Sequence, residues 1–274
     1  MNVKGKIEFI SQSHPGKVRP HNEDAIGTDL EAGLVVLADG MGGYKAGEVA
    51  SAIAIQTVTT MVAEGIKKAH KQDAEVSGFT AESLLLRDAV VKANEIINHT
   101  SKTQPQCEGM GTTIVACLYF DNRVSIAHVG DSRLYRLRKN RFEQVTLDHS
   151  LLQELISRGF YTPEEARKSL NKNLVTRALG IEPTVQVEVQ EDVALEGDIH
   201  LLCSDGLSDM VEDAEIHLTI STFSANLEVA AKQLIQLANE NGGRDNISVI
   251  LTRANAPFEL KRGFLSRLVD SWWG

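Results

Sequence analysis

The sequence predicts an α+β protein, in which antiparallel strands and helices form separate blocks along the chain. Short apolar segments between residues 112 and 145 are joined by tight turns such as Asp121-Asn122, which is typical of an antiparallel meander. Two amphipathic helices are predicted in succession before it, at residues 46–71 and 80–100. Because strands and helices do not alternate, a repeating βαβ fold is disfavoured.

The first third of the chain begins with a strand and leads into the helix pair. Residues 6–11 alternate between apolar and polar side chains, and residues 13–16 form a turn. Residues 19–24, RPHNED, are too polar for the core or for a helix. The run LVVLADG at 34–40 is too short for a core helix, so we expect a buried strand there. The helix over 46–71 ends in basic residues, as a helix C-terminus favours.

The rest of the chain continues the meander, is interrupted once, and closes with a helix and a strand. Expected strands lie at residues 112–120, 124–129, 134–137, 142–145, 185–189, 198–203 and 246–252. Residues 148–180 form a long polar, helix-rich insertion, with strand character only at 174–175, and residues 226–241 form a helix. After Asn255-Ala-Pro257 the composition changes, and residues 258–274 are predicted to form an amphipathic appendage.

The composition excludes several classes of function. The 274 residues carry a formal net charge of −9, which disfavours nucleic acid or an anionic membrane as the main partner of the folded body. Three cysteines, Cys107, Cys117 and Cys203, fit reduced core residues. The N-terminus lacks the apolar region of a signal peptide, and no apolar run reaches the length of a membrane span. We expect a cytoplasmic monomer.

Four apolar strands end or begin beside an aspartate and a glycine, and this repeated pattern indicates a shared site. Asp39 follows the first buried run, Asp131 and Asp205 follow two later strands, and Asp245 stands just before the last one. A single Asp-Gly pair is typical of a plain turn. Several of them, with the acidic cluster at 22–24, are harder to explain as turns, because a sheet brings strand ends into register.

Clustered carboxylates repel one another unless cations lie between them. Six carboxylates balanced by two or three divalent ions leave a net charge near zero, and the six are Asp24, Asp39, Asp131, Asp205, Asp209 and Asp245. Ligation by oxygen alone favours Mg²⁺ or Mn²⁺ over Zn²⁺. A dinuclear site of this kind is typical of phosphate ester hydrolysis. Arg19 supplies a forked cation that can hold a phosphate.

Six motifs follow one another along the chain: Arg19-Pro-His-Asn-Glu-Asp24, Ala38-Asp-Gly-Met-Gly-Gly43, Gly111-Thr-Thr113, Val129-Gly-Asp-Ser-Arg133, Ser204-Asp-Gly-Leu207 with Asp209, and Arg244-Asp-Asn246. In this order they resemble the protein phosphatase 2C family, the metal-dependent Ser/Thr protein phosphatases, in its bacterial form. The resemblance covers residues 5–253. It implies a four-layer α-β-β-α sandwich, two antiparallel sheets flanked by helices, with a phosphatase domain over 1–254 and an amphipathic tail over 255–274.

The resemblance also implies a dinuclear Mg²⁺ or Mn²⁺ centre that activates a bridging water for in-line hydrolysis of phosphoserine and phosphothreonine. Asp39 would bridge the two ions, and the carbonyl of Gly40 would serve the second one. Asp205 and Asp245 would complete the first. The substrates would be phosphorylated proteins, and the enzyme would reverse the action of a Ser/Thr kinase.

Other positions of the motifs have less defined roles. Asp24, with Glu23 nearby, would hold the second ion or its water, and which of the two matters more stays open. Asp131 and Asp209 fit the third ion seen in family members, and Arg19 would clamp the phosphate. A non-catalytic phosphoprotein-binding regulator on the same fold is the alternative, although a complete set of carboxylates weighs against it.

Met41 departs from the pattern of many eukaryotic members, which have histidine there as a candidate general acid. Methionine cannot donate a proton, so we expect little dependence on any single acidic side chain. Cys117 and Arg123 have the Cys-x₅-Arg spacing of thiol phosphatases, but a bulky strand end and turn separate them.

Two further segments leave alternatives open. His149 and the insertion over 148–180 fit either the mobile flap of family members or a solvated helical insertion. The tail over 258–274 fits either a segment folded back on the body or one that docks on a partner or a membrane surface.

Overall fold

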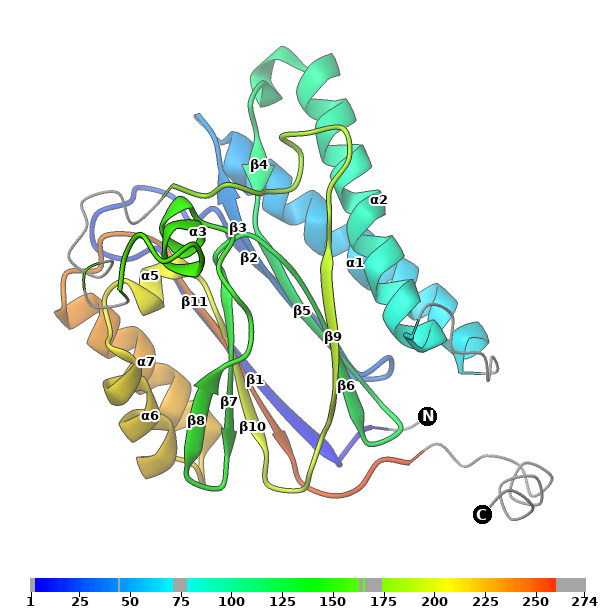
Figure 1. The fold of residues 1–274 in the computed structure, drawn as a ribbon, viewed down its shortest axis with the longest axis vertical. Coiled ribbons are helices and arrows are strands. Elements are labelled where there is room, and N and C mark those ends of the chain that lie inside the picture. The colour runs from blue at the N-terminus through cyan, green and yellow to red at the C-terminus, as the bar shows by residue number, and fades with distance from the viewer. Residues whose placement is uncertain (1–2, 44, 71–77, 163–164, 166–173, 260–274) are drawn as a thin grey trace.

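Two antiparallel sheets pack face to face in the computed structural model, which describes residues 3–43, 45–70, 78–162, 165 and 174–259 (Figure 1). The first sheet has the order β1 (Ile7–His14), β11 (Ile247–Ala254), β10 (Ile199–Cys203), β7 (Arg133–Arg138), β8 (Arg141–Gln144). The second has the order β2 (Asp24–Asp29), β3 (Leu34–Met41), β5 (Ile114–Phe120), β6 (Arg123–Val129), β9 (Glu188–Val193), and β4 (Gly111–Thr112) pairs with the end of β3.

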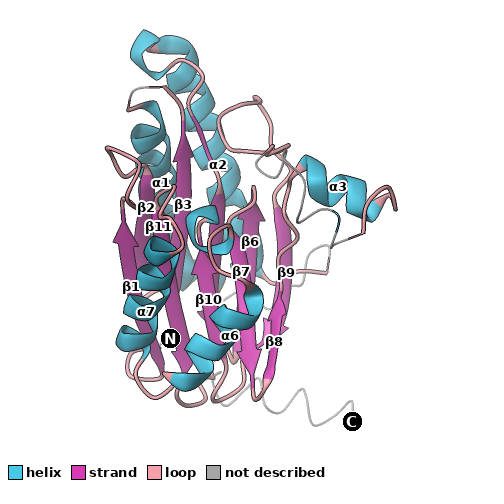
Figure 2. Ribbon diagram, turned by 90° about the vertical axis from the view of Figure 1, so that its left-hand side faces the viewer, coloured by secondary structure: helices cyan, strands magenta, loops and turns pink. Residues whose placement is uncertain are grey.

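Helices cover the outer face of each sheet and complete four layers. The long helices α1 (Ala46–Ala69) and α2 (Ala81–Thr103) pack on the second sheet, and the short η1 (Pro105–Cys107) follows them. The first sheet is covered by α6 (Asp213–Thr222) and α7 (Leu227–Glu240). The strands run along the long axis between these layers (Figure 2). The predicted α-β-β-α sandwich is therefore confirmed.

The uninterrupted apolar run that opens β3 is explained by burial on both faces of the sheet. All five residues from Leu34 to Ala38 are 0% exposed. Successive side chains of a strand point to opposite faces. Thus Leu34, Val36 and Ala38 pack under α1 and α2, whereas Val35 and Leu37 enter the core between the two sheets. The strand end that carries Asp39 is consequently held by two cores.

Helix α1 has the composition of a membrane span but packs on the outer face of the second sheet. It is the one described helix that is long and apolar enough to cross a membrane, with a mean hydropathy of 1.4. Its buried face includes Ala46, Ala50 and Ala54, whose small side chains allow the helix to lie close to the sheet. The apolar character of this helix thus serves the interface with the second sheet.

Several elements differ from the sequence-based expectation. Strand β2 was not predicted, because its polar residues and Gly27 hide its pairing with β3 along the edge of the sheet. Helix α6 was also not predicted. The expected turn at Asp205 is the first turn of a short helix, α5 (Asp205–Ser208), and the strand expected at 185–189 is β9, displaced toward the C-terminus.

The insertion over 148–180 is described only in part. It contains the short helix α3 (Leu151–Ser157). The strand character expected at 174–175 corresponds to an isolated antiparallel bridge between Ser150 and Val175.

The chain beyond β11 begins with a buried anchor. Phe258 is 1% exposed, its ring packs edge-on against Tyr119 at a centroid distance of 6.2 Å, and its backbone N–H donates to Asn122 Oδ1 at 2.6 Å. Residues 260–274, which hold most of the predicted amphipathic tail, lie outside the described residues. The boundary between a domain over 1–254 and a tail stays a prediction.

We expect Phe258→Ala to lower the free energy of unfolding by roughly 3–5 kcal/mol, because it empties a fully buried aromatic site. The matched control is Glu259→Ala, since this neighbour is exposed and should change the stability by no more than about 0.5 kcal/mol. Urea denaturation of both variants measures the difference. Equal midpoints for the two variants would show that Phe258 is not a structural anchor.

Candidate metal centre

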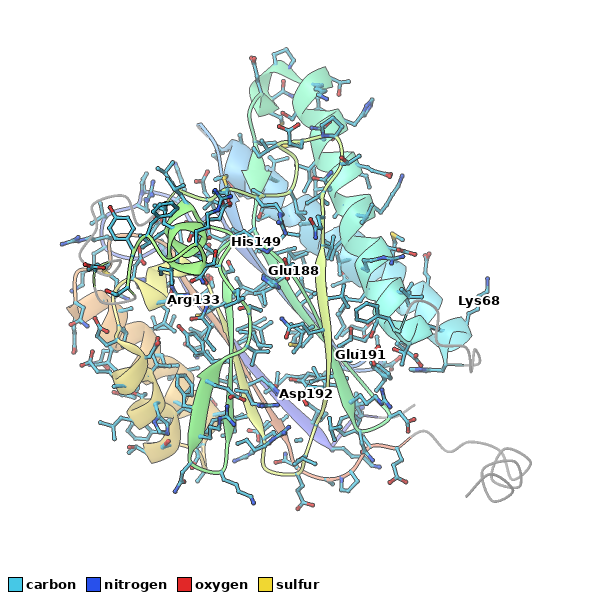
Figure 3. The ribbon with its side chains drawn as sticks, in the orientation of Figure 1. Lys68, Arg133, His149, Glu188, Glu191 and Asp192 are labelled. Carbon is cyan, nitrogen blue, oxygen red and sulfur yellow. The ribbon has the colours of Figure 1, made fainter. Side chains whose placement is uncertain are left out.

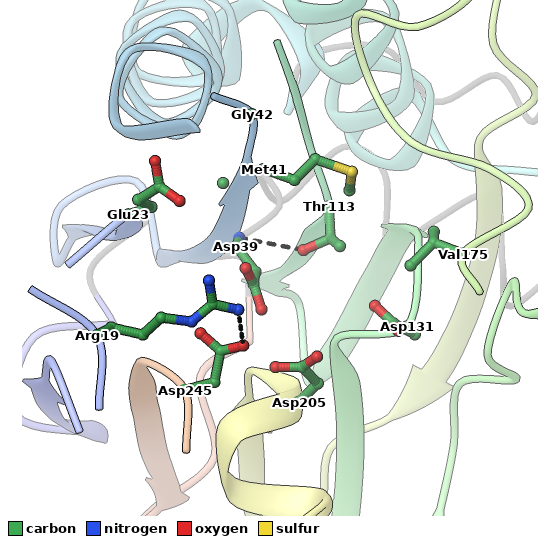
Figure 4. A pocket seen from close by; sticks show the side chains of 11 residues that line it. Arg19, Glu23, Asp39, Met41, Gly42, Thr113, Asp131, Val175, Asp205 and Asp245 are labelled. Carbon is green, nitrogen blue, oxygen red and sulfur yellow. Dashed lines mark hydrogen bonds and ion pairs between the residues drawn. The ribbon is translucent and has the colours of Figure 1, made fainter. Parts of the chain in front are cut away.

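One pocket of about 260 Å³ lies at the edge of the sandwich where strand ends of both sheets meet (Figure 4). It is lined by Arg19, Glu23, Asp39, Gly40, Met41, Gly42, Thr113, Asp131, Val175, Asp205 and Asp245. Seven of the nine residues predicted from the sequence for the site are in this list. They come from the loop before β2, the end of β3, the turn between β6 and β7, the start of α5 and the loop before β11.

The two remaining predicted residues lie beside the pocket. Asp24 is paired with Asp39 in the β2–β3 register, and its Oδ2 accepts a hydrogen bond from Ser204 Oγ at 2.9 Å. It therefore sits behind Asp39, between the two sheets. Asp209 is exposed and follows Asp205 by one helical turn. Its charge still helps to raise the pKa of both Asp131 and Asp205.

The carboxylates hold one another in an unfavourable electrostatic environment. Burial, followed by the charges of Asp24 and Asp205, raises the pKa of Asp39 well above its usual value. Burial also raises the pKa of Asp205, with Asp131 and Asp245 adding to it. The pKa of Asp131 rises to about 6, chiefly through burial. The pocket thus concentrates negative charge that a cation would relieve.

Arg19 compensates one of these carboxylates. Its Nη2 donates to Asp245 Oδ2 at 2.7 Å, and this hydrogen bond is the main reason why the pKa of Arg19 is raised (Figure 4). The guanidinium has five N–H donors, more than this contact uses, and its side chain is 52% exposed. The guanidinium therefore keeps further N–H groups at the pocket, which could bind an anion.

The donor set fits divalent metal ions that prefer oxygen. Glu23 Oε1 and Asp24 Oδ1 are buried and have no hydrogen-bond partner within the described ranges, which is unusual for carboxylates. Among those same residues no three His, Cys, Asp or Glu side chains close on a single point. Mg²⁺ commonly retains several waters and binds through one or two carboxylates, so a spaced ring of oxygens suits it and Mn²⁺ better than Zn²⁺.

Two neighbouring hydroxyls fix the end of β3. The backbone N–H of Asp39 donates to Thr113 Oγ1 at 3.1 Å, and the N–H of Thr113 donates to the Asp39 carbonyl at 2.8 Å. Thr113 Oγ1 also lies 2.7 Å from Ser132 Oγ, directly after Asp131 in the chain. On the other side, a Cβ at Gly40 would lie 2.2 Å from the carbonyl oxygen of Gly47. The first turn of α1 can approach the strand only because position 40 is glycine.

Asn246 holds the loop that carries Arg19 and Glu23. Its Nδ2 donates to the carbonyls of Pro15 and His21, and its Oδ1 accepts the backbone N–H of Glu23 at 2.7 Å. The sequence alone indicated no role for Asn246 or for Thr113. Both are polar residues beside a buried strand within a recognised motif, but Asp39 and Glu23, whose backbone N–H groups they accept, are more than 70 residues away in the chain.

Two other side chains considered from the sequence are Met41 and the thiol of Cys117. Met41 lines it, and no histidine is among its lining residues. Cys117 is fully buried in the middle of β5, and burial raises the pKa of its thiol. The alternative of a thiol phosphatase at Cys117 and Arg123 is therefore wrong, because no phosphate could reach this sulfur.

Comparison with known proteins identifies relatives over most of the chain. The family model described as Protein phosphatase 2C matches residues 14–245. The serine/threonine protein phosphatase PstP of Mycobacterium tuberculosis is 39% identical over 249 residues, which are 89% of this chain. This chain spans only 44% of the length of that relative. The serine/threonine phosphatase stp of Listeria welshimeri is 37% identical, and the match covers 88% of this chain and 93% of stp.

A solved structure has the same fold. The catalytic domain of the serine threonine protein phosphatase PstP, in complex with two manganese ions, aligns with a TM-score of 0.77 and 36% sequence identity. The alignment covers 90% of this chain and 97% of that one. The likeness therefore extends over both sheets and the helices that cover them.

We expect Asp39→Asn to stabilise the protein in a chelating buffer, because it removes one of the mutually repelling carboxylates. An increase on the order of 1 kcal/mol corresponds to roughly 2–4 °C in melting temperature for a chain of this size. Added Mn²⁺ should raise the melting temperature of the wild type and have little effect on the variant, since binding to the folded state is lost.

Asp88→Asn is the matched control, because this carboxylate is 58% exposed on α2. It should behave as the wild type with and without Mn²⁺. An Asp39→Asn protein that is destabilised in chelator and still stabilised by Mn²⁺ would contradict the repulsion described for the pocket.

Proposed function

The chain belongs to the protein phosphatase 2C family, and on that premise we propose that it is a metal-dependent phosphatase of phosphoserine and phosphothreonine in proteins. The observation that carries this proposal is a single pocket in which Glu23, Asp39, Asp131, Asp205 and Asp245 face one arginine. Carboxylates of this number suit divalent cations, and the arginine suits the phosphate that such cations would accompany.

Each carboxylate of the proposed site has a role that follows from its place. Asp39 and the carbonyl of Gly40, at the tip of β3, would hold both ions, with Asp205 and Asp245 from the first sheet completing one of them. Glu23 lines the pocket with a buried, unpartnered oxygen within the described residues, so it is the better candidate for the second ion, and Asp24 would support Asp39 from behind. Bound Mn²⁺ or Mg²⁺ would supply Lewis acidity that activates water and neutralises phosphate charge.

Further residues would complete the site. Asp131 lines the pocket on the side of Val175, and with Asp209 it would hold a third ion. Arg19 would orient the phosphate through its forked N–H groups. Met41 and Val175 line the pocket with apolar side chains and would exclude competing polar contacts rather than donate a proton.

The partners and location are further parts of this proposal. The substrates would be phosphoproteins made by a Ser/Thr kinase, and the protein would act as a monomer. The three cysteines are free and buried, which fits a reducing compartment such as the cytoplasm. Docking through residues 258–274 on a partner or a membrane surface stays a prediction, because residues 260–274 lie outside the described part of the chain.

Release of phosphate from a phosphothreonine peptide tests the proposed activity. We expect release that depends on Mn²⁺ and that falls by more than about 100-fold in Asp39→Asn and in Asp205→Asn, because even residues that only support metal ligands commonly account for 10–100-fold. Equal activity in all three proteins would contradict the mechanism. A wild type that binds the peptide with no release would instead favour a phosphoprotein-binding regulator.

Chelation and thiol alkylation should have opposite outcomes. EDTA is expected to abolish phosphate release, and added Mn²⁺ to restore it. Treatment of the native protein with N-ethylmaleimide should leave the activity intact, because Cys107, Cys117 and Cys203 are at most 4% exposed. Inactivation by N-ethylmaleimide with resistance to EDTA would require a thiol mechanism.

A further inference from the structure

The turn that carries Asp131 is held at both ends by the segment 148–150. At one end, Arg133 Nε donates to both carboxylate oxygens of Asp148 at 3.0 and 3.1 Å, and Arg133 Nη2 donates to Oδ2 at 2.7 Å. At the other end, His149 contacts Gly130. Arg133, His149 and Glu188 lie in the same region of Figure 3. The two residues 148 and 149 therefore bracket the turn from Gly130 to Arg133.

His149 and Gly130 exchange two hydrogen bonds. The backbone N–H of His149 donates to the Gly130 carbonyl at 2.9 Å, and the backbone N–H of Gly130 donates to His149 Nδ1 at 3.0 Å. Gly130 has a φ of +109°, a conformation that favours glycine, and a Cβ there would meet Thr113 at 2.6 Å. The backbone leading into Asp131 is thus held in an unusual conformation by an imidazole.

The surroundings of His149 keep its ring neutral and oriented. The side chain is 8% exposed and stacks on His128 with 4.7 Å between ring centroids. Burial, His128 and Arg177 lower the pKa of His149 to about 4, so Nδ1 has a lone pair for the Gly130 N–H at neutral pH. The ring proton is then on Nε2, which lies 3.5 Å from Glu188 Oε1. Arg177 Nη1 lies 3.1 Å from Nε2, but a guanidinium can only donate, so in this tautomer it is not a hydrogen-bond partner of that nitrogen.

The same residue also contacts the segment that carries Val175. The backbone N–H of Thr176 donates to the His149 carbonyl at 2.8 Å, and the adjacent Ser150 bridges to Val175. Val175 lines the pocket on the side where Asp131 lies (Figure 4). His149 therefore connects the turn that carries Asp131 with the segment that carries Val175.

We propose that His149 is a positioning residue, which accepts the Gly130 N–H and thereby fixes Asp131 as a metal ligand against the wall formed by Val175. The inference rests on the proposed metal-dependent function. It assigns His149 no contact with the reacting phosphate, and it distinguishes the residue from a solvated side chain of the insertion.

Substitutions at position 149 distinguish the role of the hydrogen-bond acceptor from the role of the aromatic ring. His149→Phe keeps an aromatic ring for the stack on His128 but leaves the Gly130 N–H without a partner. If His149→Phe does not fold, His149→Leu also removes the acceptor, with a smaller side chain. His149→Asn places an amide oxygen where Nδ1 stood and restores the acceptor. His217→Phe on α6 is the control for loss of a histidine elsewhere, since this ring stacks on Phe142.

Direct Mn²⁺ binding, followed by the electron paramagnetic resonance signal of free Mn²⁺, gives the readout independently of activity. We expect His149→Phe to weaken by roughly 10–100-fold the same class of Mn²⁺ site that Asp131→Asn weakens, while the other ions keep their affinity. His149→Asn and His217→Phe should bind as the wild type. In an Asp131→Asn background, His149→Phe should have no further effect, because its action passes through Asp131.

Other outcomes overturn the proposal. Wild-type binding by His149→Phe would show that the acceptor is not needed, and equal weakening in His149→Asn would show that the hydrogen bond is not the cause. If His149→Phe weakened the binding of every Mn²⁺ ion equally, and if this effect added to that of Asp131→Asn, His149 would have a general structural role. A wild type that binds no Mn²⁺ at all would instead refute the proposed function on which this inference rests.

Discussion

The arrangement around the pocket is governed by repulsion among carboxylates that the fold brings to one edge. Asp39, Asp131, Asp205 and Asp245 approach from strand ends and loops of both sheets. Burial makes ionisation of Asp39, Asp131 and Asp205 costly. The surrounding structure holds the backbone beside several of them through hydrogen bonds from neutral groups, and the ion pair of Arg133 with Asp148 adds to this support after Asp131.

Each supporting contact is made by a residue distant in sequence from the carboxylate it serves. Thr113 fixes the strand end at Asp39, Asn246 fixes the loop that carries Glu23, and His149 fixes the turn before Asp131. All three are nearly inaccessible to solvent, so their hydrogen bonds face little competition from water. A rigid frame of this kind can tolerate charged groups that would otherwise move apart.

The carboxylates of the pocket were easier to predict from the sequence than the residues that support them. An apolar run that ends in Asp and Gly is a local signal, and it marked Asp39 and Asp205 correctly as neighbours in space. Glu23 and Asp24 could not be separated in this way, because adjacent residues differ only in the direction that their side chains take. The pairing of Asp24 with Asp39, which places one behind the pocket, depends on a strand whose polar sequence gave no signal.

The position of β11 has a consequence for how the protein is made. This strand is the last in the chain, yet it lies between β1 and β10, and the loop before it supplies Asp245 and Asn246. During synthesis β1 emerges from the ribosome long before its neighbour exists, so its edge must wait unpaired while more than 200 residues are added. The proposed metal site would then be complete only after the final strand has been synthesised. A nascent chain, or one truncated before β11, would be inactive toward its substrates.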